Sequence, residues 1–190
     1  MAHPLPVRFL TFALVSLALL FAGCCANNVC DCNDAQQDAI ALRFSRDLSA
    51  SGRGFTDADL DTIVFQRYPL PYVPSGRFES VTLFRGASTG YDSTIVLNNG
   101  TPFLQVGSNK LNHYRYVVQY LAHPVGATGV PVKRGVPSPV LVIDTVRLQG
   151  SLDGSGCCTC YSNTRKAIYR DGNLTEILLK PNNHVLIAKP

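Results

Sequence analysis

The sequence lacks tryptophan, has a single methionine and is poor in charged residues, which make up 16% of the chain. Its formal net charge is only +4, and its lysines and arginines are mostly scattered singly. Proteins that follow a phosphate backbone gather such cations into a run or onto one face, so we predict no nucleic-acid partner. Few charges beside plentiful tyrosine and phenylalanine are more typical of a β-rich extracytoplasmic domain than of a cytosolic enzyme.

Recognisable catalytic motifs are also missing from the sequence. His113, His123 and His184 each fall at the end of an expected element or in a loop. None of them stands in a His-x-x-x-His pattern, and the chain has no Gly-x-Ser-x-Gly motif and no glycine-rich phosphate loop. We therefore predict a protein that is not an enzyme, with no catalytic residues and no cofactor.

Three aspartates alternate at Asp57, Asp59 and Asp61, which is how a calcium-binding loop begins. The glycine and the distant glutamate that complete such a loop are absent. Thr56 followed three residues later by Asp59 is a variant of the capping box that starts a helix. We therefore predict a helical turn over residues 57–61 and no metal site.

What the chain does contain is an apolar segment close to its beginning. Arg8 precedes the uncharged run Phe9 to Phe21, in which only Thr11 and Ser16 are polar. A cation followed by a short apolar run is the layout of a secretory signal peptide. As a helix the run would rise only about 20 Å, which is too short for a hydrocarbon core of about 30 Å. We therefore predict a signal peptide over residues 1–23 and no membrane-spanning helix there.

This segment ends in Leu19-Leu20-Phe21-Ala22-Gly23-Cys24. It resembles the lipobox of bacterial lipoproteins, in which the cysteine thiol is acylated and the chain is cleaved before it. Phe21 stands where that family most often has leucine. The resemblance implies that Cys24 is a lipidated N-terminus, that acyl chains hold the protein on a membrane, and that it lies in the bacterial cell envelope, on the periplasmic or surface face of the outer membrane. The alternative is an ordinary signal cut near Ala26, which would give a secreted protein.

The cysteines form two groups that lie far apart in the sequence. Apart from Cys24, they are Cys25, Cys30, Cys32, Cys157, Cys158 and Cys160. This even set in an oxidising compartment predicts disulfides, and close neighbours pair poorly because the bridge needs a specific geometry. We therefore expect bridges between the two groups. Thiolate binding of zinc or copper and a redox pair are the alternatives, but neither the usual zinc spacing nor a Cys-x-x-Cys motif is present.

The rest of the chain consists of short β-type segments separated by turns, with no long amphipathic helix. Strands are predicted over 39–45, 62–68, 78–84, 94–97, 102–106, 114–121, 140–143, 166–170, 176–179 and 184–188. Asn99-Gly100 predicts a hairpin between 94–97 and 102–106, and Gly150 to Gly156 reads as a linker. The pattern predicts an all-β fold: a single antiparallel β-sandwich, Ig-like or similar, over residues 36–190, after a cysteine-rich segment 24–35. A small β-barrel is the alternative.

These observations lead to an expectation of function. We expect a lipid-anchored β-sandwich protein of the envelope or cell surface with a non-enzymatic binding or structural role. A protein or glycan partner would bind loops such as Ala122 to Pro139, held on a rigid β frame. The alternative is an exported metal-handling or redox protein centred on the cysteines.

Overall fold

A computed structural model describes residue 32 and residues 37–49, 52–86, 90–104, 110–122, 135–155, 158–172, 177–178 and 184–190. The chain divides into two compact units. One comprises residues 1–34 and 151–162, and the other comprises residues 35–150 and 163–190.

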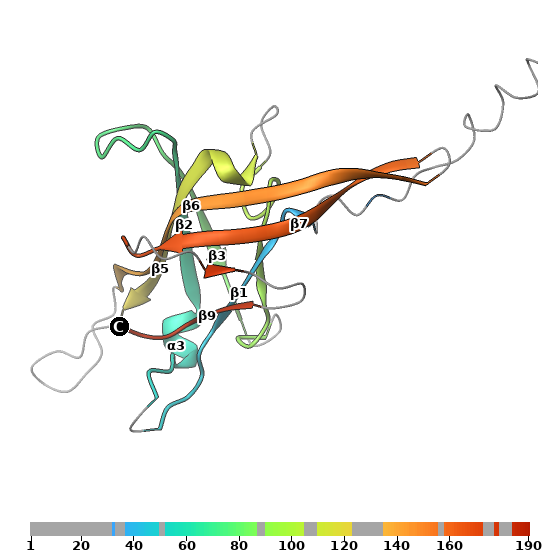
Figure 1. The fold of residues 1–190 in the computed structure, drawn as a ribbon. Coiled ribbons are helices and arrows are strands. Elements are labelled where there is room, and N and C mark those ends of the chain that lie inside the picture. The colour runs from blue at the N-terminus through green and yellow to red at the C-terminus, as the bar shows by residue number, and fades with distance from the viewer. Residues whose placement is uncertain are drawn as a thin grey trace, which may run out of the picture. The chain divides into compact units, whose positions relative to one another are not determined.

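The described strands form two sheets (Figure 1). The three-stranded sheet has the order β4 (Ile95–Leu97), β1 (Ile40–Phe44), β9 (His184–Ile187). The six-stranded sheet has the order β3 (Glu79–Phe84), β2 (Thr62–Pro69), β5 (Tyr114–Ala122), β6 (Val136–Ser155), β7 (Cys158–Arg170), β8 (Ile177–Leu178). Helical elements within the described ranges include α3 (Asp57–Leu60) and the 3-10 turn η2 (Leu111–His113). The predicted all-β sandwich is confirmed.

One strand pair departs from the expected antiparallel arrangement. β1 pairs with β9 in parallel, with Leu42 opposite Val185, whereas β1 pairs with β4 in antiparallel fashion. A parallel pair needs a long connection, and here the intervening chain includes all the other strands. The sequence prediction of a purely antiparallel sandwich was wrong at this pair, because the patterning of a single strand does not reveal its partner's direction.

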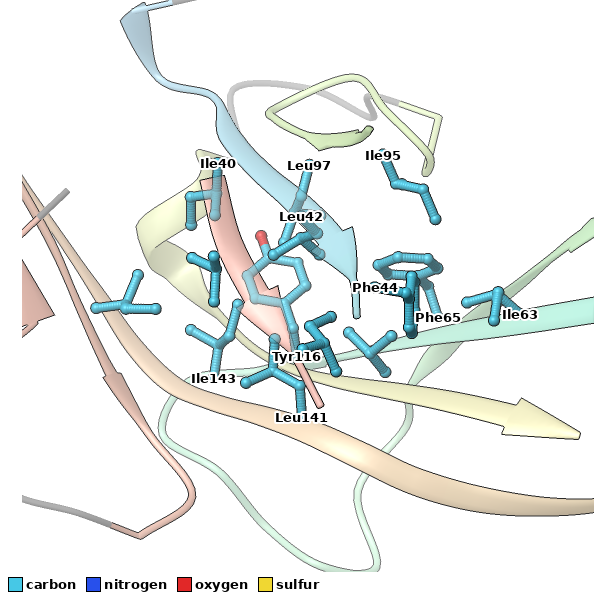
Figure 2. Packing of buried hydrophobic residues seen from close by; sticks show 14 of the residues in the cluster. Ile40, Leu42, Phe44, Ile63, Phe65, Ile95, Leu97, Tyr116, Leu141 and Ile143 are labelled. Atoms are coloured by element: carbon cyan, nitrogen blue, oxygen red, sulfur yellow. The ribbon is translucent and has the colours of Figure 1, made fainter. Parts of the chain in front are cut away.

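The two sheets of the second unit share one hydrophobic core (Figure 2). Alternate residues of β1, β4, β5 and β9 point into it, as the period of two in a β-strand requires. The core residues from the three-stranded sheet include Ile40, Leu42, Phe44, Ile95, Leu97, Val185 and Ile187, and those from the six-stranded sheet include Ile63, Phe65, Tyr116, Val118, Tyr120, Leu141 and Ile143. Tyr114, Tyr116, Val118 and Tyr120 share the face of β5 that points into this core.

The helical turn α3 begins at the predicted capping box. The Thr56 side chain accepts a hydrogen bond from the Asp59 backbone N–H, and the Asp59 carboxylate accepts one from the Thr56 backbone N–H. Lys189 Nζ also donates to the Asp59 carboxylate at 2.8 Å. Burial pushes the pKa of Asp59 upward, but the hydrogen bonds from Lys189 and Thr56 outweigh it and hold the pKa below its ordinary value. Asp57 and Asp59 therefore belong to a helix start, whereas Asp61 is the C-cap residue of the same turn.

The predicted Asn-Gly hairpin was wrong. β4 pairs with β1 instead of residues 102–106, and Pro102 to Leu104 form no strand, while residues 105–106 lie outside the described part. The Asn98 side chain accepts hydrogen bonds from the backbone N–H groups of Gly100 and Thr101, at 2.8 and 2.7 Å, and so builds a local turn of another kind. Among the described residues the positive φ angles are those of Gly90, Asp171 and Gly172. The two-residue turn that needs such angles is therefore absent at Asn99-Gly100.

β6 is much longer than predicted. Residues 136–139, expected as the end of a loop, pair with β5, where Val136 lies opposite Ala122. Residues 150–155, expected as a linker, continue the same strand. Residues 123–134 of the expected binding loop lie outside the described residues. A glycine weakens a strand without ending it when a partner strand is present, which explains why the linker prediction failed.

Candidate binding surface

The first unit contains a disulfide bond between Cys32 and Cys160, whose Cα atoms lie 5.3 Å apart. This bond joins the two cysteine groups, as the sequence predicted. Cys24, Cys25, Cys30 and Cys157 lie outside the described residues, and of Cys158 only the backbone, at the start of β7, is described. Their pairing and the lipidation of Cys24 stay predictions. The disulfide sulfurs of Cys32 and Cys160 are not available as thiolate ligands.

The structure does not bring together the histidines that it describes. His113 is exposed at the end of η2, and His184 is exposed at the start of β9, whereas His123 lies outside the described part. No group of three or more histidine, cysteine or acidic side chains suited to a metal occurs within the described ranges.

An exposed group of aromatic side chains lies at one end of β2 and in the loop between β2 and β3. Tyr68 stacks on Phe78, with ring centroids 5.1 Å apart, and meets Tyr72 edge to face at 5.4 Å. The guanidinium of Arg115 lies 4.3 Å from the centroid of the Tyr72 ring. Tyr72 and Phe78 remain 39% and 50% exposed. We call these four residues the aromatic platform.

The sheet register places the aromatic platform on the face opposite to the core. Tyr68 of β2 lies directly across from Arg115 of β5, and both alternate with the buried Arg67 and Tyr116. The loop after β2 turns back through a hydrogen bond from the Gly76 N–H to the Val73 carbonyl at 2.9 Å. Rigid strands therefore hold two members of the platform, and ring contacts fix the loop members Tyr72 and Phe78 against them.

Arg115 is oriented from the neighbouring strand. Its Nε donates a hydrogen bond to Asp144 Oδ1 of β6 at 3.0 Å, and the other oxygen of Asp144 accepts one from the Gly172 N–H at 2.7 Å. Among the residues that the structure describes, no acceptor pairs with the two Nη groups of Arg115. The aromatic platform therefore has flat apolar rings beside hydrogen-bond donors whose positive charge is already balanced.

No protein-family model, no curated protein and no solved structure matches this chain. Within the described ranges, no helix has the length and apolar character needed to cross a membrane. The candidate surface therefore rests on its own geometry.

A second polar cluster lies beside the start of β1. Asp38, which is 7% exposed, accepts hydrogen bonds from the side-chain amides of Asn163 and Asn99, at 2.8 and 3.2 Å. Lys166 Nζ donates to the backbone carbonyls of Gln37 and Ala39. Burial lowers the pKa of Lys166, and Asp38 partly offsets that effect. Because these groups satisfy one another, the cluster fixes the chain where it enters the sandwich.

A surface hollow of about 250 Å³ is lined by Arg53, Leu141, Arg170, Asp171 and residues near the end of the chain. Arg170 Nε lies 3.8 Å from the Asp171 carboxylate, so this cation already has an ionic partner. Arg53 is itself exposed. The hollow is a weaker candidate than the aromatic platform because it offers no group of fixed, unpaired donors.

Sequence reasoning missed the aromatic platform. Tyr68, Tyr72 and Phe78 fall within a short stretch that also contains Pro69, Pro71 and Pro74, and the strands predicted over 62–68 and 78–84 say nothing of a binding surface there. The density of aromatic residues in an exposed, proline-rich loop is the signal that could have found it.

Proposed function

We propose that this chain is a lipid-anchored binding protein of the bacterial cell envelope, non-enzymatic, which holds a partner on the aromatic platform. The observation that supports binding is the fixed, half-exposed arrangement of Tyr72 and Phe78 around Tyr68. Solvent-exposed rings of this kind are enriched where proteins bind partners, because they bury a large apolar area at little cost in conformational entropy.

The anchoring part of the proposal rests on the resemblance of Leu19 to Cys24 to a lipobox. Acyl chains on Cys24 would hold the mature protein on the membrane, since two or more chains give stable attachment and a single chain does not. The disulfide between Cys32 and Cys160 fits an oxidising compartment outside the cytoplasm.

The first prediction concerns this anchor. Replacing Cys24 by serine removes the thiol that carries the lipid, so we expect the protein to move from the membrane fraction to the soluble fraction and to lose radiolabelled palmitate. The matched control is Cys25→Ser, which changes the adjacent cysteine and should stay labelled and membrane-bound. A Cys24→Ser protein that remains in the membrane fraction, together with an unlabelled wild type, would contradict the anchor.

The exported metal-handling or redox protein is the competing function. Two of its candidate ligands, Cys32 and Cys160, are joined in a disulfide. Counting free thiols in the purified protein tests the metal-handling version directly, because cysteines bind a metal only as thiolates.

A further inference from the structure

We propose that the ligand of the aromatic platform is a neutral glycan. This inference rests on the proposed binding function and names the chemical class of its partner. It follows from three properties of the platform: the flatness of its exposed rings, the free donors beside them and its balanced charge.

The rings match the shape of a sugar. A pyranose has an apolar face of C–H groups and a rim of hydroxyls, and the face packs on an aromatic ring whose negative π surface attracts the C–H hydrogens. Tyr72 and Phe78 both contact the Tyr68 ring, at 5.4 and 5.1 Å, so they form one continuous group rather than isolated side chains. A group of this kind can hold more than one sugar unit of a chain.

The donors match the rim of a sugar. Arg115 has five N–H groups, and its Nε donates to Asp144 while the guanidinium lies 4.3 Å from the Tyr72 ring centroid. The guanidinium therefore covers one face of Tyr72, and its Nη groups, which pair with no described residue, lie next to the exposed rings on which the sugar would stack. They can donate to hydroxyl or ring oxygens at its edge.

The charge argues for a neutral ligand over an acidic one. Arg115 and Asp144 form an ion pair at 3.0 Å, with side chains 21% and 29% exposed. An acidic ligand drawn to Arg115 would meet the Asp144 carboxylate, and repulsion would offset the attraction. A neutral sugar hydroxyl is not repelled by the Asp144 carboxylate.

The test is calorimetric titration of the detergent-solubilised full-length protein with cello-, malto- and manno-oligosaccharides. Oligogalacturonate serves as the acidic probe and a proline-rich decapeptide as the peptide probe. We expect at least one neutral series to bind, with an affinity unchanged between low and high salt because no charge is neutralised. Tyr72→Ala and Phe78→Ala should each weaken binding by about tenfold or more, since each removes a stacking ring.

The matched control is Phe84→Ala. Phe84 is a 79% exposed aromatic residue at the far end of β3, about 20 Å from Phe78 along the strand, and its loss should leave binding unchanged. The inference is overturned if no neutral series binds, if only oligogalacturonate or the peptide binds, or if the Tyr72 and Phe78 variants bind like wild type. Because the titration is done in detergent, and is repeated with Cys24→Ser, its result is independent of the membrane anchor.

Discussion

The two faces of the six-stranded sheet each carry an arginine that packs against aromatic rings and pairs with an acid. On the core face, Arg67 lies 4.6 and 4.5 Å from the centroids of Phe103 and Tyr114 and donates to Glu79 at 2.7 Å. On the outer face, Arg115 lies 4.3 Å from the Tyr72 centroid and pairs with Asp144 at 3.0 Å. The side-chain chemistry of the two arginines is nearly the same.

Burial separates the roles of the two arginines. Arg67 is 3% exposed, whereas the side chain of Arg115 is 21% exposed. Cation–π attraction and hydrogen bonds strengthen where water is excluded, but water competes for them at the surface. Arg67 therefore stabilises the sandwich, and Arg115 keeps donors available to a ligand.

The strongest test of this comparison is Arg67→Ala. It removes the buried methylene groups of the side chain, the contacts with the Phe103 and Tyr114 rings, and the hydrogen bond to the Leu104 carbonyl at 3.1 Å. We therefore expect a loss of about 3 kcal/mol in the free energy of unfolding. Urea unfolding followed by circular dichroism measures it. Arg67→Met keeps most of the volume and separates the packing contribution from the charge. A loss below about 1 kcal/mol for Arg67→Ala would show that burial does not make this arginine structural.

Tyr116→Phe tests the core face with a smaller change. The Tyr116 hydroxyl donates to the Leu111 carbonyl at 2.9 Å, and the side chain is 1% exposed. Its removal leaves a buried carbonyl without that donor, so we expect a loss of about 1 kcal/mol in the same unfolding assay. Tyr72→Phe on the outer face is the control and should change stability by less than about 0.5 kcal/mol. Equal losses in the two variants would contradict the contrast between the faces.

The same tyrosine predicts how stability depends on alkaline pH. Burial raises the pKa of Tyr116 far above its ordinary value, although the nearby charge of Arg67 acts in the opposite direction. The unfolded chain then loses the phenolic proton more easily than the folded protein does. The stability that depends on the neutral Tyr116 phenol is therefore fully present below a pH of about 10, and it falls as the pH rises above that value. The urea midpoint of the wild type should fall more steeply in that range than the midpoint of Tyr116→Phe.

The sequence predicted those parts of the fold that depend on local patterns. Alternation identified β1 and β5 as strands, and Thr56 with Asp59 identified the helix start. It failed where the outcome depends on a distant partner. β4 joins β1 instead of a hairpin at Asn99-Gly100, because pairing with a distant strand buries Ile95 and Leu97 in the core.

The candidate site was harder to predict than the fold. The expected binding loop was placed at Ala122 to Pro139, where residues 136–139 proved to be strand. The aromatic platform joins residues that are far apart in the chain, such as Tyr72 and Arg115. Only the register of β2 against β5, which sequence patterns do not give, brings Tyr68 opposite Arg115.

Arg115→Ala should change the free energy of unfolding only slightly. Its ion pair with Asp144 is partly exposed, and pairs of this kind contribute about 0.5 kcal/mol to the free energy of unfolding. In 1 M salt the contribution is smaller still, because the Debye length, over which salt screens charges, falls to about 3 Å. The unfolding assay at low and high salt should therefore hardly distinguish this variant from wild type. Arg115→Lys keeps the charge but loses the planar group that lies on Tyr72. Because that contact is also at the surface, the stability of this variant should be close to that of the wild type as well. A loss from Arg115→Ala comparable to that from Arg67→Ala would mean that the outer arginine is as structural as the inner one, and that the aromatic platform exists to hold the loop in place.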